Sequence, residues 1–146
     1  MTEDHRVFEW ALREVVKPEL AKIGFRPTGG RRFRAIKGDG ATWEVEFQLG
    51  VRALEGKFTV NLMVQEPNSK SPTIVRIGSV RQSWRSRFLA RLFPSPRSIW
   101  RTLLGARDLW WPLTPFEHEA RTSFSSVVAI LLSDGVAWFQ ENTHAT

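Results

Sequence analysis

Alternating apolar and polar positions mark the middle of the chain. From residue 42 to 49 every second side chain is apolar, and the same alternation recurs from 57 to 65. Successive side chains of a strand point to opposite faces, so each segment predicts a strand with one buried and one wetter face. Such alternation is typical of antiparallel sheets. The predicted strands are residues 32–37, 42–49 and 57–65, with 73–77 as a candidate fourth.

Helical periodicity marks the first part of the chain. Apolar residues recur three or four positions apart from Phe8 to Ile23, and Thr2 is well placed to cap the first turn. Pro18 lacks a backbone donor, so it predicts a kink or a split in this helix. Gly24 predicts the end of the helix, because glycine readily adopts the left-handed conformation of a C-terminal cap.

The clearest helix signal lies near the end of the chain. Thr114 is predicted to cap this helix, with Pro115 at its first position and Glu117 completing a capping box. An apolar stripe that includes Phe124 follows, and Gly135 is predicted to stop the helix. Two further helices are predicted, at residues 83–93 and 99–104.

These elements predict a single α+β domain over residues 1–146. We expect an antiparallel sheet of three or four strands, with the N-terminal and C-terminal helices packed on one face. A chain of 146 residues that is 42% hydrophobic can bury a sizeable core. The chain has no cysteine, which excludes disulfides, a thiolate nucleophile and a cysteine-based zinc site.

The sequence predicts a cytoplasmic location without a membrane span. The acidic start of the chain lacks the basic and apolar regions of a signal peptide. The longest uninterrupted apolar run is residues 127–132, whereas a helix needs about 20 predominantly apolar residues to cross a bilayer.

Positive charge is concentrated in one segment. Residues 67–107 carry nine basic and no acidic residues, whereas 1–66 carry eleven basic and ten acidic, and 108–146 carry one and five. Aromatic residues are interleaved with these arginines, and a local basic block of this kind favours an anionic partner. We call residues 67–107 the basic segment. Its candidate partner-binding residues are Arg81, Trp84, Arg85, Arg87, Arg91, Arg97, Trp100 and Arg101.

The basic segment has three interpretations. Its arginines suit the carboxylates of an acidic protein, or they suit phosphates while the aromatic rings stack on bases. Alternatively, they pair with carboxylates of the same chain or stay hydrated. No recognised nucleic-acid motif is present. The leading hypothesis is a non-enzymatic binding module that uses this segment against an acidic protein, with non-specific nucleic-acid binding as an alternative.

Catalytic and metal signatures are weak. The chain has no nucleophile elbow, P-loop or dinucleotide fingerprint, and its three histidines are far apart, so we predict no metal and no cofactor. Glu44, Glu46 and Gln48 share one strand face, and paired carboxylates catalyse proton transfer when their pKa values are pushed apart. A hydrolase or transferase built on this pocket is therefore an alternative, against the simpler interpretation of a solvated sheet face.

Two adjacent tryptophans, Trp110 and Trp111, follow the basic segment. Such a pair most often anchors a loop to the core, because large aromatic rings are mostly buried. The alternative is an exposed platform for a partner, since tryptophan is enriched at binding hot spots. We expect the structural role for this pair.

Short motifs in a fixed order resemble a bacterial family called domain of unknown function 4304. They extend over most of the chain, from about residue 7 to 139. The motifs are Lys17-Pro18-Glu19-Leu20 leading to Gly24-Phe25, Phe33-Arg34, Glu46-Phe47-Gln48, Phe58-Thr59-Val60-Asn61-Leu62, Trp84-Arg85-Ser86-Arg87 and Asp108-Leu109-Trp110-Trp111-Pro112-Leu113. Met63 departs from the glycine frequent in the family, and residues 89–106 look expanded. The resemblance implies a compact α+β domain and assigns no catalytic residue.

Overall fold

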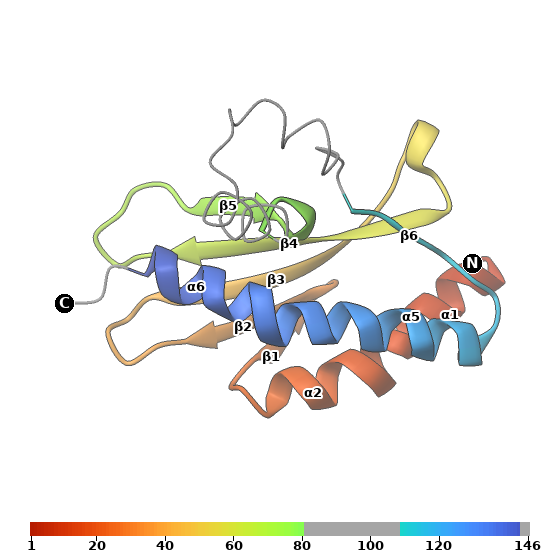
Figure 1. The fold of residues 1–146 in the computed structure, drawn as a ribbon, viewed down its shortest axis with the longest axis horizontal. Coiled ribbons are helices and arrows are strands. Elements are labelled where there is room, and N and C mark those ends of the chain that lie inside the picture. Colours follow the sequence, from red (N-terminus) through yellow and green to blue (C-terminus); the bar gives the residue numbers. More distant parts are fainter. Residues whose placement is uncertain (81–108, 144–146) are drawn as a thin grey trace, which may run out of the picture.

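The computed structural model of the protein describes residues 1–80 and 109–143. In those residues a layer of helices lies across one antiparallel sheet (Figure 1). The helical segments are α1 (Glu3–Ala11), η1 (Leu12–Val16), α2 (Lys17–Ala21), η2 (Arg52–Leu54), α5 (Glu117–Ile130), η3 (Leu131–Gly135) and α6 (Val136–Asn142). The strands are β1 (Arg26–Gly29), β2 (Arg32–Ile36), β3 (Thr42–Leu49), β4 (Lys57–Gln65), β5 (Thr73–Arg76) and β6 (Trp111–Pro112). The helices predicted at residues 83–93 and 99–104 lie outside the described residues.

The described strands form one sheet in the order β1-β2-β3-β4-β5, with β6 paired to β4. Every pairing is antiparallel, so the predicted α+β fold is confirmed. The four predicted strands are present, and β1 and β6 add to them. Neither strand shows an alternation of apolar and polar residues. Strand β1 contains Pro27, is exposed at all four positions and pairs irregularly with β2, and β6 has only two residues.

The N-terminal helices form one bent rod, as predicted from Pro18. The hydroxyl of Thr2 accepts a hydrogen bond from the backbone nitrogen of His5, at 3.4 Å, and so caps α1. A five-residue π-helical segment, η1, then separates α1 from α2, whose first turn contains Pro18. Proline cannot donate to the preceding turn and its ring crowds the carbonyl four residues back, so the helix widens just before it. Gly24 follows with a φ of 92°, which confirms the predicted end of the rod.

The start of the C-terminal helix differs from the prediction. Helix α5 begins at Glu117, and its N-cap residue is Phe116 rather than Thr114. The Thr114 hydroxyl instead accepts from the backbone nitrogen of Phe116, at 3.2 Å, and donates to Glu119, at 2.7 Å. The predicted capping box was therefore wrong, because Thr114 makes a local turn three residues before the first residue of the helix.

Gly135 does not stop the C-terminal helix. It has a helical φ of −64°, and the chain continues through η3 into α6. The continuation buries Phe139, whose ring stacks on Trp43 at a centroid distance of 4.9 Å. A glycine inside a helix costs about 1 kcal/mol, and burying an aromatic ring of this size outweighs that cost.

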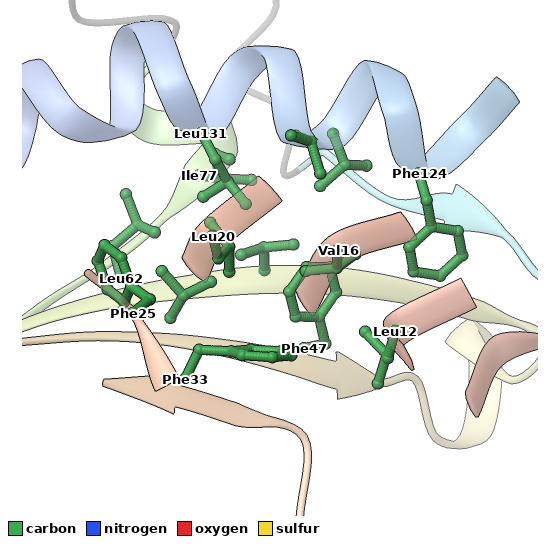
Figure 2. Close-up of a cluster of buried hydrophobic side chains, with 14 of the residues drawn as sticks. Leu12, Val16, Leu20, Phe25, Phe33, Phe47, Leu62, Ile77, Phe124 and Leu131 are labelled. Carbon is green, nitrogen blue, oxygen red and sulfur yellow. The ribbon is translucent and has the colours of Figure 1, made fainter. Parts of the chain in front are cut away.

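The N-terminal rod consists of α1, η1 and α2, and we call the continuous run of α5, η3 and α6 the C-terminal rod. Both rods pack on the same face of the sheet, as predicted. The Phe124 ring of α5 stacks on Phe58 of β4, at 4.6 Å between centroids, and Phe8 of α1 meets Phe58 edge-on at 5.3 Å. Phe47 of β3 lies 6.0 Å from Phe124. Figure 2 shows this core, in which side chains from both helical rods lie against apolar side chains of the sheet.

The C-terminal rod is also the one described helix that is long and apolar enough to cross a membrane. Residues Glu117–Asn142 form 26 consecutive helical positions. Their apolar stripe, which includes Phe124 and Leu131, is buried against the sheet. A core helix of a globular domain has the same length and composition, so this property is weak evidence for a membrane span.

Candidate partner-binding surface

The sheet has a second face, on the side away from the helices. Directly opposed residues in neighbouring strands point to the same face, so the strand register identifies its members. We call this surface the polar face. It comprises Arg26 of β1, Arg32, Arg34 and Ile36 of β2, Thr42, Glu44, Glu46 and Gln48 of β3, Thr59, Asn61, Met63 and Gln65 of β4, and Ile74 and Arg76 of β5.

Arginines of β2 neutralise the carboxylates of β3. Arg34 sits directly opposite Glu44, and its Nη2 lies 3.1 Å from Glu44 Oε2. Arg32 sits opposite Glu46, with 2.6 Å between Nε and Oε2, and lies 3.8 Å from Glu44. The Glu44 side chain is only 6% exposed, whereas both arginines remain about half exposed. The burial of Glu44 is therefore compensated by two cations whose own outer surfaces still reach solvent.

We call this row of ion pairs across β2 and β3 the ladder. Asn61 of β4 extends it by hydrogen bonds. Its amide nitrogen donates to Gln48, at 2.7 Å, and to Glu46, at 3.2 Å. Arg32 also donates a hydrogen bond to Glu46, and this bond is the main reason that the pKa of Arg32 is raised above its ordinary value, followed by the charges of Glu46 and Glu44. Each of the three residues proposed as a pocket thus has at least one polar partner in the ladder.

The predicted catalytic alternative gains little from this geometry. The structure brings Glu44, Glu46 and Gln48 onto one face, as the alternation predicted. A pair of carboxylates that works as acid and base needs environments that separate their pKa values. Here both carboxylates lie in ion pairs with arginines of β2, so the arrangement is an ion-pair ladder.

The flanks of residues 81–108 meet beside β4, between its pairings with β5 and β6. A Cβ atom placed on Gly78 would lie 2.7 Å from the backbone nitrogen of Leu109, so the two chain segments touch at a glycine. The hydroxyl of Thr59, a buried residue of the polar face, donates to the carbonyl of Leu109 at 2.7 Å. The chain therefore leaves and re-enters the described fold at one place, beside β4.

The two tryptophans after the basic segment have different environments. Trp111 packs against the core, with its ring stacked on Phe58 at 5.7 Å between centroids. Trp110 is half-buried, and the Arg76 guanidinium lies 5.3 Å from its ring centroid. Trp111 therefore anchors the returning chain, as expected, while Trp110 stacks with a cation of the polar face.

The predicted partner-binding residues lie outside the described residues. These are Arg81, Trp84, Arg85, Arg87, Arg91, Arg97, Trp100 and Arg101. What the structure places is the point at which their segment joins the fold, next to Thr59 and Arg76.

A second basic cluster was missed in the sequence. Residues 26–37 contain five basic and no acidic residues, and this hairpin of β1 and β2 supplies Arg26, Arg32 and Arg34 to the polar face. The signal was present, but the balance of charge over residues 1–66 conceals it. Strand pairing is what converts it into a surface, because it sets these arginines on one face beside the carboxylates of β3.

The described residues also form a shallow depression in the helical layer, away from the polar face. It lies between α1, α5 and the segment before α5, and it is lined by residues that include Asp4, Leu113 and Ser123. Among the described residues no group of three or more histidine, aspartate and glutamate side chains could hold a metal ion.

Comparisons with known proteins found no counterpart for this arrangement. No protein-family model matches the chain, and no curated protein or solved structure matches it. The resemblance to domain of unknown function 4304 therefore stays a prediction.

Proposed function

We propose that the protein is a non-enzymatic, cytoplasmic binding module that recognises an acidic protein through its basic segment. The charge distribution carries the proposal, because residues 67–107 hold nine basic and no acidic residues. A concentrated field of one sign raises the association rate with a partner of the opposite sign and selects against partners of the same sign. We also propose that the chain is a divergent relative of the family that its motifs resemble.

The join between the basic segment and the fold supports a binding role. Gly78 and Leu109 touch, and Thr59 holds Leu109 from the sheet. The positions at which residues 81–108 leave and re-enter the described fold therefore lie together, beside β4.

The composition of the polar face favours a protein over a nucleic acid as partner. Sheets that bind single-stranded nucleic acids stack bases on aromatic side chains of the strands. The strand positions of the polar face include no aromatic residue and instead expose Ile36 and Ile74, at 76% and 62%. Exposed aliphatic side chains among arginines suit a protein surface better.

The direct test is affinity capture from native lysate with charge reversal. The tested variant changes Arg85, Arg87 and Arg91 to Glu, and the control changes Arg13, Lys17 and Lys22 to Glu. The control residues are exposed on the N-terminal rod, so both triples alter the net charge equally. We expect the first triple to lose the captured acidic protein and the control to retain it. Equal recovery by all three proteins would remove the basic segment from the binding role.

A further inference from the structure

The β1–β2 hairpin places two arginines directly opposite each other. Arg26 of β1 pairs in register with Arg34 of β2, so both side chains project from the polar face. Directly opposed residues have Cβ atoms about 4.5–5.5 Å apart, and like charges at that spacing destabilise the sheet. An unfavourable pair on an exposed surface indicates a role other than stability.

The carboxylates of β3 do not neutralise this pair. Arg34 and Arg32 share Glu44 and Glu46, whereas Arg26 has no carboxylate partner in the described part of the chain. Three guanidinium groups therefore face two carboxylates at this end of the polar face. A further carboxylate beside Arg26 would complete the charge balance and relieve its repulsion with Arg34.

An exposed apolar side chain lies next to these arginines. Ile36 follows Arg34 by two positions on the same face of β2 and is 76% exposed. An aliphatic contact beside an unpaired guanidinium is the pattern of a protein-binding surface, in which an apolar contact is flanked by charge. A free phosphate or a nucleic acid backbone would make no use of Ile36.

We propose that Arg26, Arg34 and Ile36 form a second contact site, which binds an acidic side chain and an adjoining apolar side chain of the same acidic partner. This inference rests on the proposed function and extends it to the other end of the sheet. Arg26 and Arg34 hold a carboxylate between them, while Ile36 packs against the neighbouring apolar residue. The described fold thereby presents a basic site of its own in addition to the basic segment.

The test uses the full chain and a fluorescein-labelled decaglutamate peptide, followed by fluorescence anisotropy in dilute buffer. Arg26→Gln is expected to weaken binding about three- to fivefold, the range for losing one exposed charge contact. Arg13→Gln removes the same charge from the helical layer, where Arg13 pairs with Glu14, and is expected to change binding less than about twofold. Thermal unfolding of Arg26→Gln should occur at the same or a higher temperature, because the substitution removes a like-charge pair.

The outcomes separate this inference from the proposed function. If the Arg85, Arg87 and Arg91 reversal abolishes binding while Arg26→Gln binds as tightly as Arg13→Gln, the second contact site is wrong and the basic segment stands. If only Arg26→Gln weakens binding, the second site stands without the basic segment. Failure of the wild-type protein to bind decaglutamate would overturn the inference. The inference would also be overturned if the wild-type protein bound an oligothymidylate more tightly than decaglutamate and Arg26→Gln weakened that binding. This result would identify a nucleic-acid surface.

Discussion

The two faces of the sheet are built from the same strands and are stabilised in different ways. One face is a continuous aromatic and aliphatic core under two helical rods, with Phe58 and Phe124 near its centre. The other is a ladder of arginines, carboxylates and amides whose members mostly keep contact with solvent. On the first face burial supplies the free energy of folding, whereas on the second face most charged groups stay partly solvated.

This contrast explains why substitutions on the two faces should have different consequences. A change in the core opens a cavity that close-packed neighbours fill only partly, so its cost is large. A change on the polar face mainly exchanges one solvated interaction for another, so its cost in stability is small and its effect on binding is larger. The following substitutions test that difference, in order of decreasing effect.

The largest effect is expected at Phe124 of the helical face. Phe124→Ala should lower the free energy of unfolding by about 3–5 kcal/mol, because the ring is 2% exposed and stacks on Phe58. Phe116→Ala is the matched control, since that ring is 55% exposed, and should cost less than about 0.5 kcal/mol. Urea titration measures both. Equal unfolding midpoints for the two variants would contradict the assignment of the core.

The next effect is expected where the basic segment joins the fold. Gly78→Ala should destabilise by about 1–3 kcal/mol, because its Cβ would lie 2.7 Å from a backbone atom of Leu109. Gly38→Ala is the control, since nothing lies within 4 Å of its Cβ position. Denaturant titration compares the two variants. A Gly78→Ala protein as stable as Gly38→Ala would show that these chain segments are not in contact.

A smaller effect is expected for the carboxylate inside the ladder. Glu44→Gln should cost about 1–2 kcal/mol, because a buried side chain loses its charge-assisted hydrogen bonds to Arg34. The half-exposed Arg34 can turn to water, which limits the loss. Glu55→Gln, an exposed glutamate of the β3–β4 loop, should be nearly neutral in the same thermal unfolding experiment. A loss as large as that of Phe124→Ala would mean that the polar face is part of the core.

The smallest effect is expected from an exposed ion pair of α1. The Arg6 side chain hydrogen-bonds to Glu3 and lowers the pKa of that carboxyl below its ordinary value of 4.5. A lowered pKa in the folded state adds stability above pH 4.5, and this contribution disappears as the pH falls through the folded value. Wild type should therefore exceed Glu3→Gln slightly in thermal stability at neutral pH, and the two should converge in acid. If the stability difference between wild type and Glu3→Gln became larger as the pH fell, the lowered pKa of Glu3 would be contradicted.

Much of the fold follows from local pattern in the sequence. The alternation in β3 and β4 identified the inner and outer residues of both strands, and Pro18 and Gly24 located the break and the end of the first rod. The failures at Thr114 and Gly135 have different causes. Thr114 uses its hydroxyl in a local turn with Phe116 and Glu119. At Gly135 the helix continues because Phe139 packs on Trp43, a tertiary contact that the local sequence does not encode.

The candidate site was less accessible to sequence reasoning. Glu44 and Glu46 were recognised as neighbours on one face, but their partners Arg32 and Arg34 were not, because cross-strand pairing depends on register. The same register brings Arg26 opposite Arg34. The net charge of a long segment does not show which arginines pair with carboxylates, whereas the strand register does.

The central proposal is that the basic segment and the polar face recognise the partner, whereas the helical face stabilises the fold. Hydrogen–deuterium exchange of the wild-type protein with and without decaglutamate tests this claim most directly. The account predicts slower exchange in residues 67–107 and in the β1–β2 hairpin, and unchanged exchange in α5. Protection confined to α1 and α5, with the hairpin and residues 67–107 unaffected, would contradict it.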